Sequence, residues 1–210
     1  MATKFARSAD FKTPPCRVLY AYNLFKTRKA EDGGKEKFGC TLVFANEHKP
    51  MLEKIVAGVI VEQWGEKGLE RARQGLIKSP FLAGDGKEAR NKTTGEINPG
   101  FGSGLFFIRP SANADRAPVV RFRSANIPAT EEEVYSGCRG FAVLNAFAWN
   151  NPKNGDGVSF GIQYFQKTGD DEKLGGSGGV DPEKWHEKIE DKGAAPESTQ
   201  NGAGAGGLFG

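Results

Sequence analysis

The side chains that most often carry catalysis are sparse in this sequence. It has two histidines, His48 and His186, and three separated cysteines, Cys16, Cys40 and Cys138. His48 lies near the start of a predicted helix and His186 lies in the C-terminal tail, so they are not placed as a dyad or a metal pair. An odd set of cysteines is typical neither of a disulfide framework nor of a zinc site. We therefore expect no enzyme, no metal and no cofactor, and buried thiols in a reducing cytoplasm.

Two further patterns look like binding sites but lack the surroundings that the chemistry needs. Glu131-Glu132-Glu133 offers carboxylates for Mg²⁺, but consecutive side chains on a strand point to opposite faces, which favours a solvated acidic turn. The glycine-rich runs 100–104 and 202–206 resemble dinucleotide-binding loops. Neither lies between a strand and a helix, as binding of the phosphates requires.

Basic and aromatic side chains, in contrast, are interleaved along several predicted strands. Binding a single nucleic-acid strand needs cations that replace counterions along the phosphates and flat rings that stack on bases. In Arg121-Phe122-Arg123 the two arginines share one face of a strand and Phe122 faces the other way, so the arginines are free to meet phosphate if Phe122 is a core residue. The candidate DNA-binding residues are Arg17, Tyr20, Lys26, Lys87, Arg90, Lys92, Phe107, Arg109, Arg121, Arg123, Arg139, Trp149, Lys153, Tyr164 and Lys167. Because most strand aromatics are core residues, we expect a minority of these rings to be exposed.

The net charge of +3 averages two opposite segments. Residues 170–210 hold nine acidic side chains and four lysines, a net −5, whereas residues 1–169 hold 25 basic and 17 acidic side chains, a net +8. A basic body attracts polyanions, although a charge of this size also serves solubility alone. We divide the chain into a domain over 1–169 and a flexible, acidic, glycine-rich tail over 170–210, in which 182–192 could form a short helix.

The pattern of elements predicts a mainly β fold with one long helix. Residues 16–25 are rich in β-branched and aromatic types and follow Pro14-Pro15, which suits the start of a strand. Further strands are predicted over 38–44, 105–109, 119–123, 141–149 and 158–166. Apolar residues at helical spacing predict a helix over 48–74, with a break near Gly65 or Gly68. No apolar run is long enough to span a bilayer, which excludes an integral membrane protein.

The predicted connections favour a barrel. The charged stretch 26–37 is typical of a hairpin loop, and Asn150 to Gly155 of the hairpin turn between the last two strands. Residues 84–104 hold six glycines and three cations with no hydrophobic period, which predicts a long mobile loop. Antiparallel strands joined in this way fit a small closed or partly open barrel.

Several runs together resemble a family of phage single-stranded DNA-binding proteins. They are Tyr135-Ser136-Gly137-Cys138, the strand ending in Asn145-Ala146-Phe147-Ala148-Trp149-Asn150-Asn151, Gly157-Val158-Ser159-Phe160-Gly161 and Gln166-Lys167. The strand 16–22 and the long helix are also similar, so the resemblance covers residues 10–170. It implies an OB-fold-like, five-stranded antiparallel barrel with long inserted loops, a groove that binds single strands without sequence preference, and a disordered acidic tail.

The resemblance also implies a role and partners. The protein is expected to coat and protect single-stranded DNA during phage replication and recombination in the cytoplasm of an infected bacterium. The acidic tail is expected to tune affinity and to contact phage or host replication proteins through Leu208 and Phe209. The protein as a whole is expected to have no membrane partner and to self-associate weakly on DNA. The alternative is a phage structural or protein-interaction β-barrel module that does not bind nucleic acid.

Overall fold

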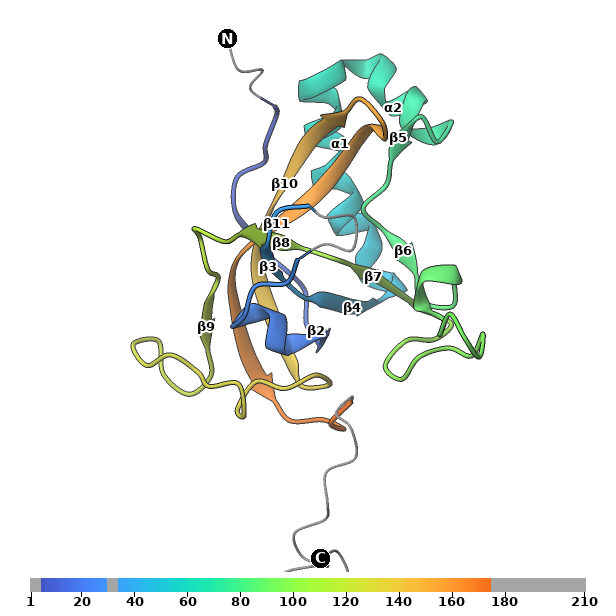
Figure 1. The fold of residues 1–210 in the computed structure, drawn as a ribbon. Helices are drawn as coiled ribbons and strands as arrows, with labels where there is room; N and C mark the ends of the chain where they lie inside the picture. Colours follow the sequence, from blue (N-terminus) through green and yellow to red (C-terminus); the bar gives the residue numbers. More distant parts are fainter. Residues whose placement is uncertain (1–4, 30–33, 175–210) are drawn as a thin grey trace, which may run out of the picture. The chain divides into compact units, whose positions relative to one another are not determined.

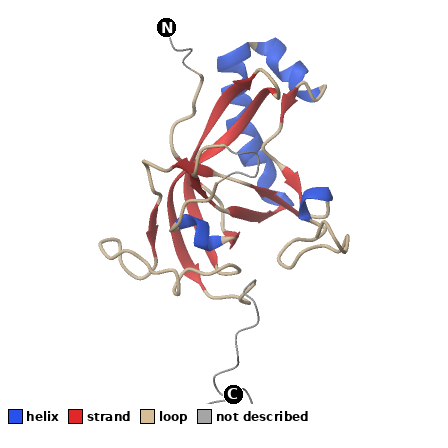
Figure 2. Cartoon of the chain, viewed as in Figure 1, coloured by secondary structure: helices blue, strands red, loops and turns tan. Residues whose placement is uncertain are grey.

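The computed structural model describes residues 5–29 and 34–174, and most of its regular structure is β (Figure 2). The strands are β1 (Phe11–Lys12), β2 (Cys16–Leu19), β3 (Lys37–Gly39), β4 (Thr41–Ala45), β5 (Ile77–Lys78), β6 (Leu82–Ala83), β7 (Leu105–Ile108), β8 (Ser111–Asn113), β9 (Val119–Arg121), β10 (Arg139–Asn151) and β11 (Gly155–Gly169). The helices are α1 (Lys49–Trp64) and α2 (Glu66–Arg73), with 3-10 turns η1 (Ala21–Leu24), η2 (Asn46–His48) and η3 (Lys87–Ala89). The tail residues 175–210 lie outside the described part.

The long hairpin of β10 and β11 organises the sheet. The two strands pair antiparallel from Arg139↔Gly169 to Asn151↔Gly155, which confirms the hairpin predicted from alternation. Figure 1 shows one end of this hairpin beside α1, α2 and β5 and the other end towards β9. β1 and β2 pair with β10, while β5, β8 and β9 pair with β11. Five of the described strands are therefore placed directly by this hairpin.

The sheet differs from the predicted five-stranded antiparallel barrel. It has eleven strands in the order β3-β8-β11-β10-β2-β4-β7-β6 with β1, β5 and β9 as branches, and β5, β8 and β9 run parallel to β11. β7 pairs with β4 and β8 with β11, and only Arg109-Pro110 separates the two strands. Following the paired strands from β7 through β4, β2, β10 and β11 to β8 therefore leads back to the residues that directly follow β7 in the chain. The strands that alternation does not mark, β1, β5, β6 and β8, have only two or three residues and make up the difference.

The two faces of β10 have different roles. Its small and aliphatic side chains face the core, namely Ala142, Leu144, Ala146 and Ala148, and all are buried. Its large side chains, Phe141, Val143, Phe147 and Trp149, alternate with them and stay partly exposed. The core side receives fully buried rings from other strands, including Phe44, Phe106, Phe160 and Phe165. Burial of one such ring stabilises the fold by roughly 1.5–3 kcal/mol. The small residues on β10 leave room for these rings and for α1, which packs against β10.

The predicted helix is broken at Gly65, as its sequence suggested. Pro50 lies in the first turn of α1, where a missing N–H costs no hydrogen bond. Gly65 has φ 68° between α1 and α2, a conformation that glycine adopts without strain. α1 buries Leu52, Val56, Val59 and Ile60 in the core. No helix in the described ranges is long and apolar enough to cross a membrane.

The loop over 84–104 is more organised than its composition predicted. Arg90 and Ile97 form a β-bridge, and the Arg90 guanidinium donates to the backbone oxygens of Asp85 and Gly95 at 3.2 and 3.0 Å. The Asn98 amide donates to the Ala89 oxygen at 2.9 Å. Ala89 is fully buried in a small cluster outside the main core. Hydrogen bonding within the loop thus gives it local structure that its missing hydrophobic period does not predict.

Candidate nucleic-acid interface

Two arginines from different strands meet at one end of the hairpin. Arg17 on β2 and Arg139 on β10 are register partners. Both guanidinium groups contact the same carboxylate, that of Asp171, at 2.6 and 2.7 Å. The exposed tyrosines Tyr20 and Tyr22 follow a few residues after Arg17 in the chain. We refer to Arg17, Tyr20, Tyr22, Arg109 and Arg139 as the arginine face.

Asp171 holds the C-terminal part of the described chain against this face. Its pKa falls from an ordinary 3.8 to about 2, chiefly through the hydrogen bond from Arg17, with a further one from the Glu172 backbone N–H. Leu174 donates its N–H to the Ser136 oxygen at 2.7 Å, and its side chain is buried with Leu19. The boundary predicted after residue 169 therefore lies too early, because residues 170–174 pack on the body.

The exposed tyrosines are presented by an unusual turn. Tyr20 has φ 54°, which makes it the one non-glycine residue with positive φ in the described ranges. This conformation costs an L-residue roughly 1–2 kcal/mol. The η1 turn follows at once, and the Ala21 N–H is held by the Ser136 hydroxyl at 3.0 Å. Tyr20 and Tyr22 are 46% and 54% exposed. The predicted strand over 16–25 therefore ends at Leu19. Residues 20–25, which were predicted to continue it, instead place the rings of Tyr20 and Tyr22 in solvent.

The register places Val43 opposite both Arg17 and Phe107, so Phe107 and, by alternation, Arg109 share the sheet face of Arg17. Of these two residues only Arg109 is exposed. Phe107 is 0% exposed, under Phe101 at a ring distance of 4.7 Å, so this predicted DNA-binding residue has no exposed ring face in the free protein. The Arg109 guanidinium lies 5.3 Å from the Phe107 ring and donates to the Glu88 oxygen at 3.2 Å. The loop over 84–104 covers Phe107, which β-alternation alone does not reveal.

The predicted loop cations and Lys26 differ in how they are engaged. Lys87 and Lys92 are exposed in the loop that borders the arginine face. Arg90 is exposed too, but its guanidinium holds the loop together as described above. Lys26 is exposed and pairs with Glu131 at 2.9 Å. These residues supply positive charge near the arginine face, with Arg90 fixed in place.

Three predicted cations have structural contacts instead. Arg121 donates to the backbone oxygens of Ala125 and Val120 at 2.7 and 2.9 Å. Arg123 is exposed and lies 5.2 Å from the Phe122 ring. Lys167 is only 4% exposed, donates to the Glu133 oxygen at 2.7 Å and pairs with Asp170 at 2.6 Å. Burial and these contacts hold Lys167 within the body, so this predicted DNA-binding cation is not exposed in the free protein.

The last three candidates lie away from the arginine face. Tyr164 is on β11, opposite Val143, and Trp149 and Lys153 are at or beside the tip of the hairpin. Arg139 and Trp149 are ten positions apart on β10, which is about 30 Å at the rise of an extended strand. The fifteen predicted residues are therefore spread along the hairpin and beyond the arginine face.

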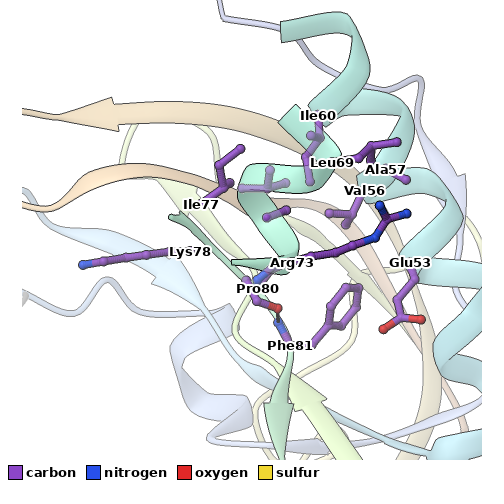
Figure 3. A pocket seen from close by; sticks show the side chains of 13 residues that line it. Glu53, Val56, Ala57, Ile60, Leu69, Arg73, Ile77, Lys78, Pro80 and Phe81 are labelled. Carbon is purple, nitrogen blue, oxygen red and sulfur yellow. Dashed lines mark hydrogen bonds between the residues drawn. The ribbon is translucent and has the colours of Figure 1, made fainter. Parts of the chain in front are cut away.

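A pocket of about 420 Å³ lies between α1, α2 and the segment 77–81 (Figure 3). Its walls are mostly apolar and include Val56, Ile60, Leu69 and Phe81. Its charged residues are Glu53, Arg73 and Lys78. None of the predicted DNA-binding residues lines it, so the pocket and the arginine face are separate features.

The residues considered for chemistry give no assembled site within the described part of the chain. Cys16, Cys40 and Cys138 are buried free thiols there, and burial raises the pKa of each; that of Cys138 rises to about 11. No group of three or more His, Cys, Asp or Glu side chains in residues 5–29 and 34–174 is arranged to hold a metal ion. His186 lies outside these residues.

Sequence reasoning missed two cations, Arg7 and Lys12. Both are exposed on the N-terminal segment that pairs with β10. Arg7 forms a bridge with Phe147, and Lys12 is the register partner of Val143. The aromatic residues that they approach lie more than a hundred positions later in the chain. Only a predicted pairing of the N-terminus with β10 could have found them.

Comparison with known protein families adds the deciding observation. Residues 10–194, most of the chain, match the family described as Enterobacter phage Enc34, ssDNA-binding protein. The chain belongs to this family. The match favours a DNA-binding protein over an enzyme or a structural β-barrel module.

Solved structures that are similar to this chain have a similar fold. The structure of the single-stranded DNA-binding protein from bacteriophage Enc34 in complex with ssDNA has a TM-score of 0.57 and 19% identity, covering 79% of this chain and 89% of that one. A C-terminal truncation of that phage protein has a TM-score of 0.54 and 19% identity, covering 83% and 99%. These OB-fold structures confirm the fold class as mainly β with one long helix. Protein p50 of Acyrthosiphon pisum secondary endosymbiont phage 1 is 27% identical over 153 residues, 68% of this chain and 76% of that protein.

Proposed function

We propose that this protein binds single-stranded DNA without sequence preference through the arginine face. Membership in the Enc34 ssDNA-binding family is the observation that carries the proposal. The arginine face supplies the two kinds of group that such binding needs, exposed rings in Tyr20 and Tyr22 and cations in Arg17, Arg109 and Arg139. Because rings stack on any base and cations contact any phosphate, such a surface does not select a sequence.

Binding would replace one anion with another at Arg17 and Arg139. In the free protein both guanidinium groups contact Asp171. A phosphate offers an arginine an anionic oxygen partner as Asp171 does, and binding it releases counterions from the DNA. Stacking on tyrosine adds about 1–3 kcal/mol per base, which a duplex with its bases already stacked does not offer. Single strands should therefore displace Asp171 more readily than duplexes do.

The acidic C-terminal segment is proposed to tune this affinity. Residues 170–210 carry −5, and their first acidic residues already lie at the arginine face through Asp171. Such a segment competes with weakly held polyanions and so favours single strands over duplexes. Leu208 and Phe209, outside the described residues, are proposed as its contacts to phage or host replication proteins.

The cellular role follows from the binding mode. A protein that covers single strands regardless of sequence would coat and protect the DNA exposed during phage replication and recombination. Its place of action would be the cytoplasm of the infected bacterium, with weak self-association along the DNA. Exposed tyrosines and arginines at one face are consistent with this role, and no cofactor is required for it.

The proposal is tested by titrating the full-length protein with oligo-dT at two salt concentrations, with duplex as competitor. We expect quenching of tyrosine or tryptophan fluorescence, an affinity that falls with salt at a log–log slope of about 0.7 per phosphate contact, and weak competition by duplex. An absence of quenching and of any salt-dependent binding would instead indicate a β-barrel module without nucleic-acid affinity.

A further inference from the structure

The outward side of β10 forms a second surface of basic and aromatic groups. The N-terminal segment runs antiparallel beside β10, with Phe11 opposite Leu144 and Arg7 bridged to Phe147. This pairing places the exposed side chains of Arg7 and Lys12 next to the outward rings of the hairpin. We refer to Arg7, Lys12, Phe141, Phe147, Trp149 and Tyr164 as the β10 face.

Each cation of the β10 face lies over a ring. Lys12 Nζ is 3.9 Å from the centre of the Phe141 ring, and Arg7 Cζ is 5.5 Å from that of Phe147. Phe141 and Tyr164 lie 6.2 Å apart and are tilted by 33°. A cation held over a partly exposed ring keeps its charge in solvent and its position fixed. The surface therefore combines phosphate-binding cations with aromatic rings, and a base would stack on Phe141 or Phe147 as the cation above that ring turns to a phosphate.

The strand opposite leaves these rings accessible. Phe147 and Trp149 face Ser159 and Gly157 across the ladder, and Asn145 faces Gly161. A Cβ at Gly157 would meet the indole of Trp149 at 2.2 Å, so the ring lies directly over this glycine. The Trp149 N–H is held by the Ser159 hydroxyl at 2.9 Å. Small partners on β11 thus support the rings from the side without covering them.

The charge of this surface selects the kind of partner. Arg7 and Lys12 lie along it, and the exposed Lys153 is in the turn beyond Trp149. Asp10, the acidic residue of the segment 5–12, accepts a hydrogen bond from the Asn145 amide at 3.1 Å. A positive surface with partly exposed rings complements a polyanion whose flat bases are free to stack.

We propose that the β10 face is a second contact track for single-stranded DNA, continuous with the arginine face. The inference rests on the proposed function. Arg139 belongs to the arginine face, and Phe141, two residues further along the same side of β10, belongs to the β10 face. A DNA strand that runs from Arg139 towards the tip of the hairpin first meets Phe141 with Lys12, then Phe147 with Arg7, and then Trp149. The binding site is thereby extended along about 30 Å of β10.

The test uses oligonucleotide length to separate the two surfaces. The variant Arg7→Gln/Lys12→Gln and a matched control, Lys54→Gln/Lys67→Gln with exposed cations of α1 and α2, are compared with the full-length protein. Each is titrated with oligo-dT of roughly 5 and roughly 16 nucleotides, lengths near the limits of one OB-fold site. For the long oligonucleotide we expect the first variant to bind at least about threefold more weakly, with a salt slope lower by about 1.4 for two lost phosphate contacts. Its affinity for the short oligonucleotide and both affinities of the control should stay unchanged.

The other outcomes overturn the inference. Equal losses for both lengths would place Arg7 and Lys12 in the primary site, and no loss for either length would remove them from the DNA path. A drop in self-association without a change in DNA affinity would make this surface a contact between copies. If the unaltered protein bound neither oligonucleotide, the proposed function itself would fail, which the other outcomes do not imply.

A second variant examines the rings and keeps the test decisive if the charge variant is poorly folded. Phe147→Leu retains an apolar side chain but removes the flat face under Arg7. Stacking on aromatic residues is the sequence-tolerant part of single-strand binding. We expect weaker binding of the long oligonucleotide with an unchanged salt slope. Unchanged affinity of this variant would overturn the stacking part of the inference.

Discussion

At the scale of single residues, the environment of a side chain decides its role more than its type does. Arg121 and Lys167 were predicted as phosphate ligands, but backbone oxygens and burial engage them. Arg17 and Arg139 face an anion already, in Asp171. A sequence gives the residue type and its alternation, but the partner of each arginine comes from segments far away in the chain.

Replacing Asp171 should strengthen DNA binding. Asp171→Asn removes the carboxylate that both arginines contact, so less energy is needed to free them. Exposed ion pairs are weak, so we expect a gain in oligo-dT affinity of up to about fivefold. Glu172→Gln carries the same change of charge next to Asp171 and should have a smaller effect. Fluorescence titration measures both, and equal gains would show that only the net charge matters.

A side chain at position 157 should lower the unfolding free energy, because the Trp149 indole lies over Gly157. Gly157→Ala places a Cβ where the indole lies, and such overpacking typically costs about 1–3 kcal/mol of unfolding free energy. Gly169→Ala, at the other end of the same strand, meets nothing within 4 Å and serves as the control. Urea unfolding compares the two, together with the emission of Trp149. Equal stability of both variants would mean that the ring moves aside without cost.

At the scale of elements, local patterns predicted the long hairpin and the helix break but not the short strands. The alternation over 141–166 and the glycine at 65 carry their signals locally. β5, β6 and β8 have two or three residues and owe their conformation to pairing with β11 or β7. Likewise, the cover over Phe107 comes from the loop 84–104, which has no hydrophobic period to reveal it.

The link between α2 and the tip of the hairpin should depend on pH. Asp156 accepts from the Asn150 amide at 2.9 Å and from Arg71 at 2.6 Å, and these hydrogen bonds lower its pKa below 3.8. A carboxyl whose pKa is lowered by folding stabilises the protein above its unfolded pKa, and this contribution is lost as the pH falls through the folded value. Asp156→Asn should therefore reduce the unfolding free energy by about 0.5–1 kcal/mol at pH 7.

The difference between Asp156→Asn and the unaltered protein should shrink as the pH falls below about 4. Urea unfolding at pH 7 and near pH 3 measures it, and Asp115→Asn in an exposed turn is the control. A difference that stays constant over this range would show that the charge of Asp156 does not contribute to the link.

At the scale of the whole molecule, opposite charges in one chain are the main organising feature. A net +8 over residues 1–169 and −5 over 170–210 can be read from the sequence. What the sequence did not reveal is that residues 170–174 pack on the body, with Leu174 buried and Asp171 between two arginines. Contacts of that kind depend on surfaces that exist only after folding.

Shortening the chain should weaken discrimination against duplex DNA in two steps. A chain ending at residue 174 loses the remaining acidic residues but keeps Asp171, and a chain ending at 169 also loses Asp171 and Leu174. We expect duplex affinity at low salt to rise at each step, because the competing anions are removed. Circular dichroism checks that both chains are folded. Duplex affinity that is the same for all three chains would refute the competition.

The most direct measurement of the central claim is the salt dependence of oligo-dT affinity for Arg17→Gln/Arg139→Gln, with Lys54→Gln as control. If single strands bind at the arginine face, the double variant loses affinity and its log–log salt slope falls by about 1.4, while the control is unchanged. If both affinity and slope of the folded double variant equal those of the unaltered protein, single-stranded DNA does not bind at the arginine face.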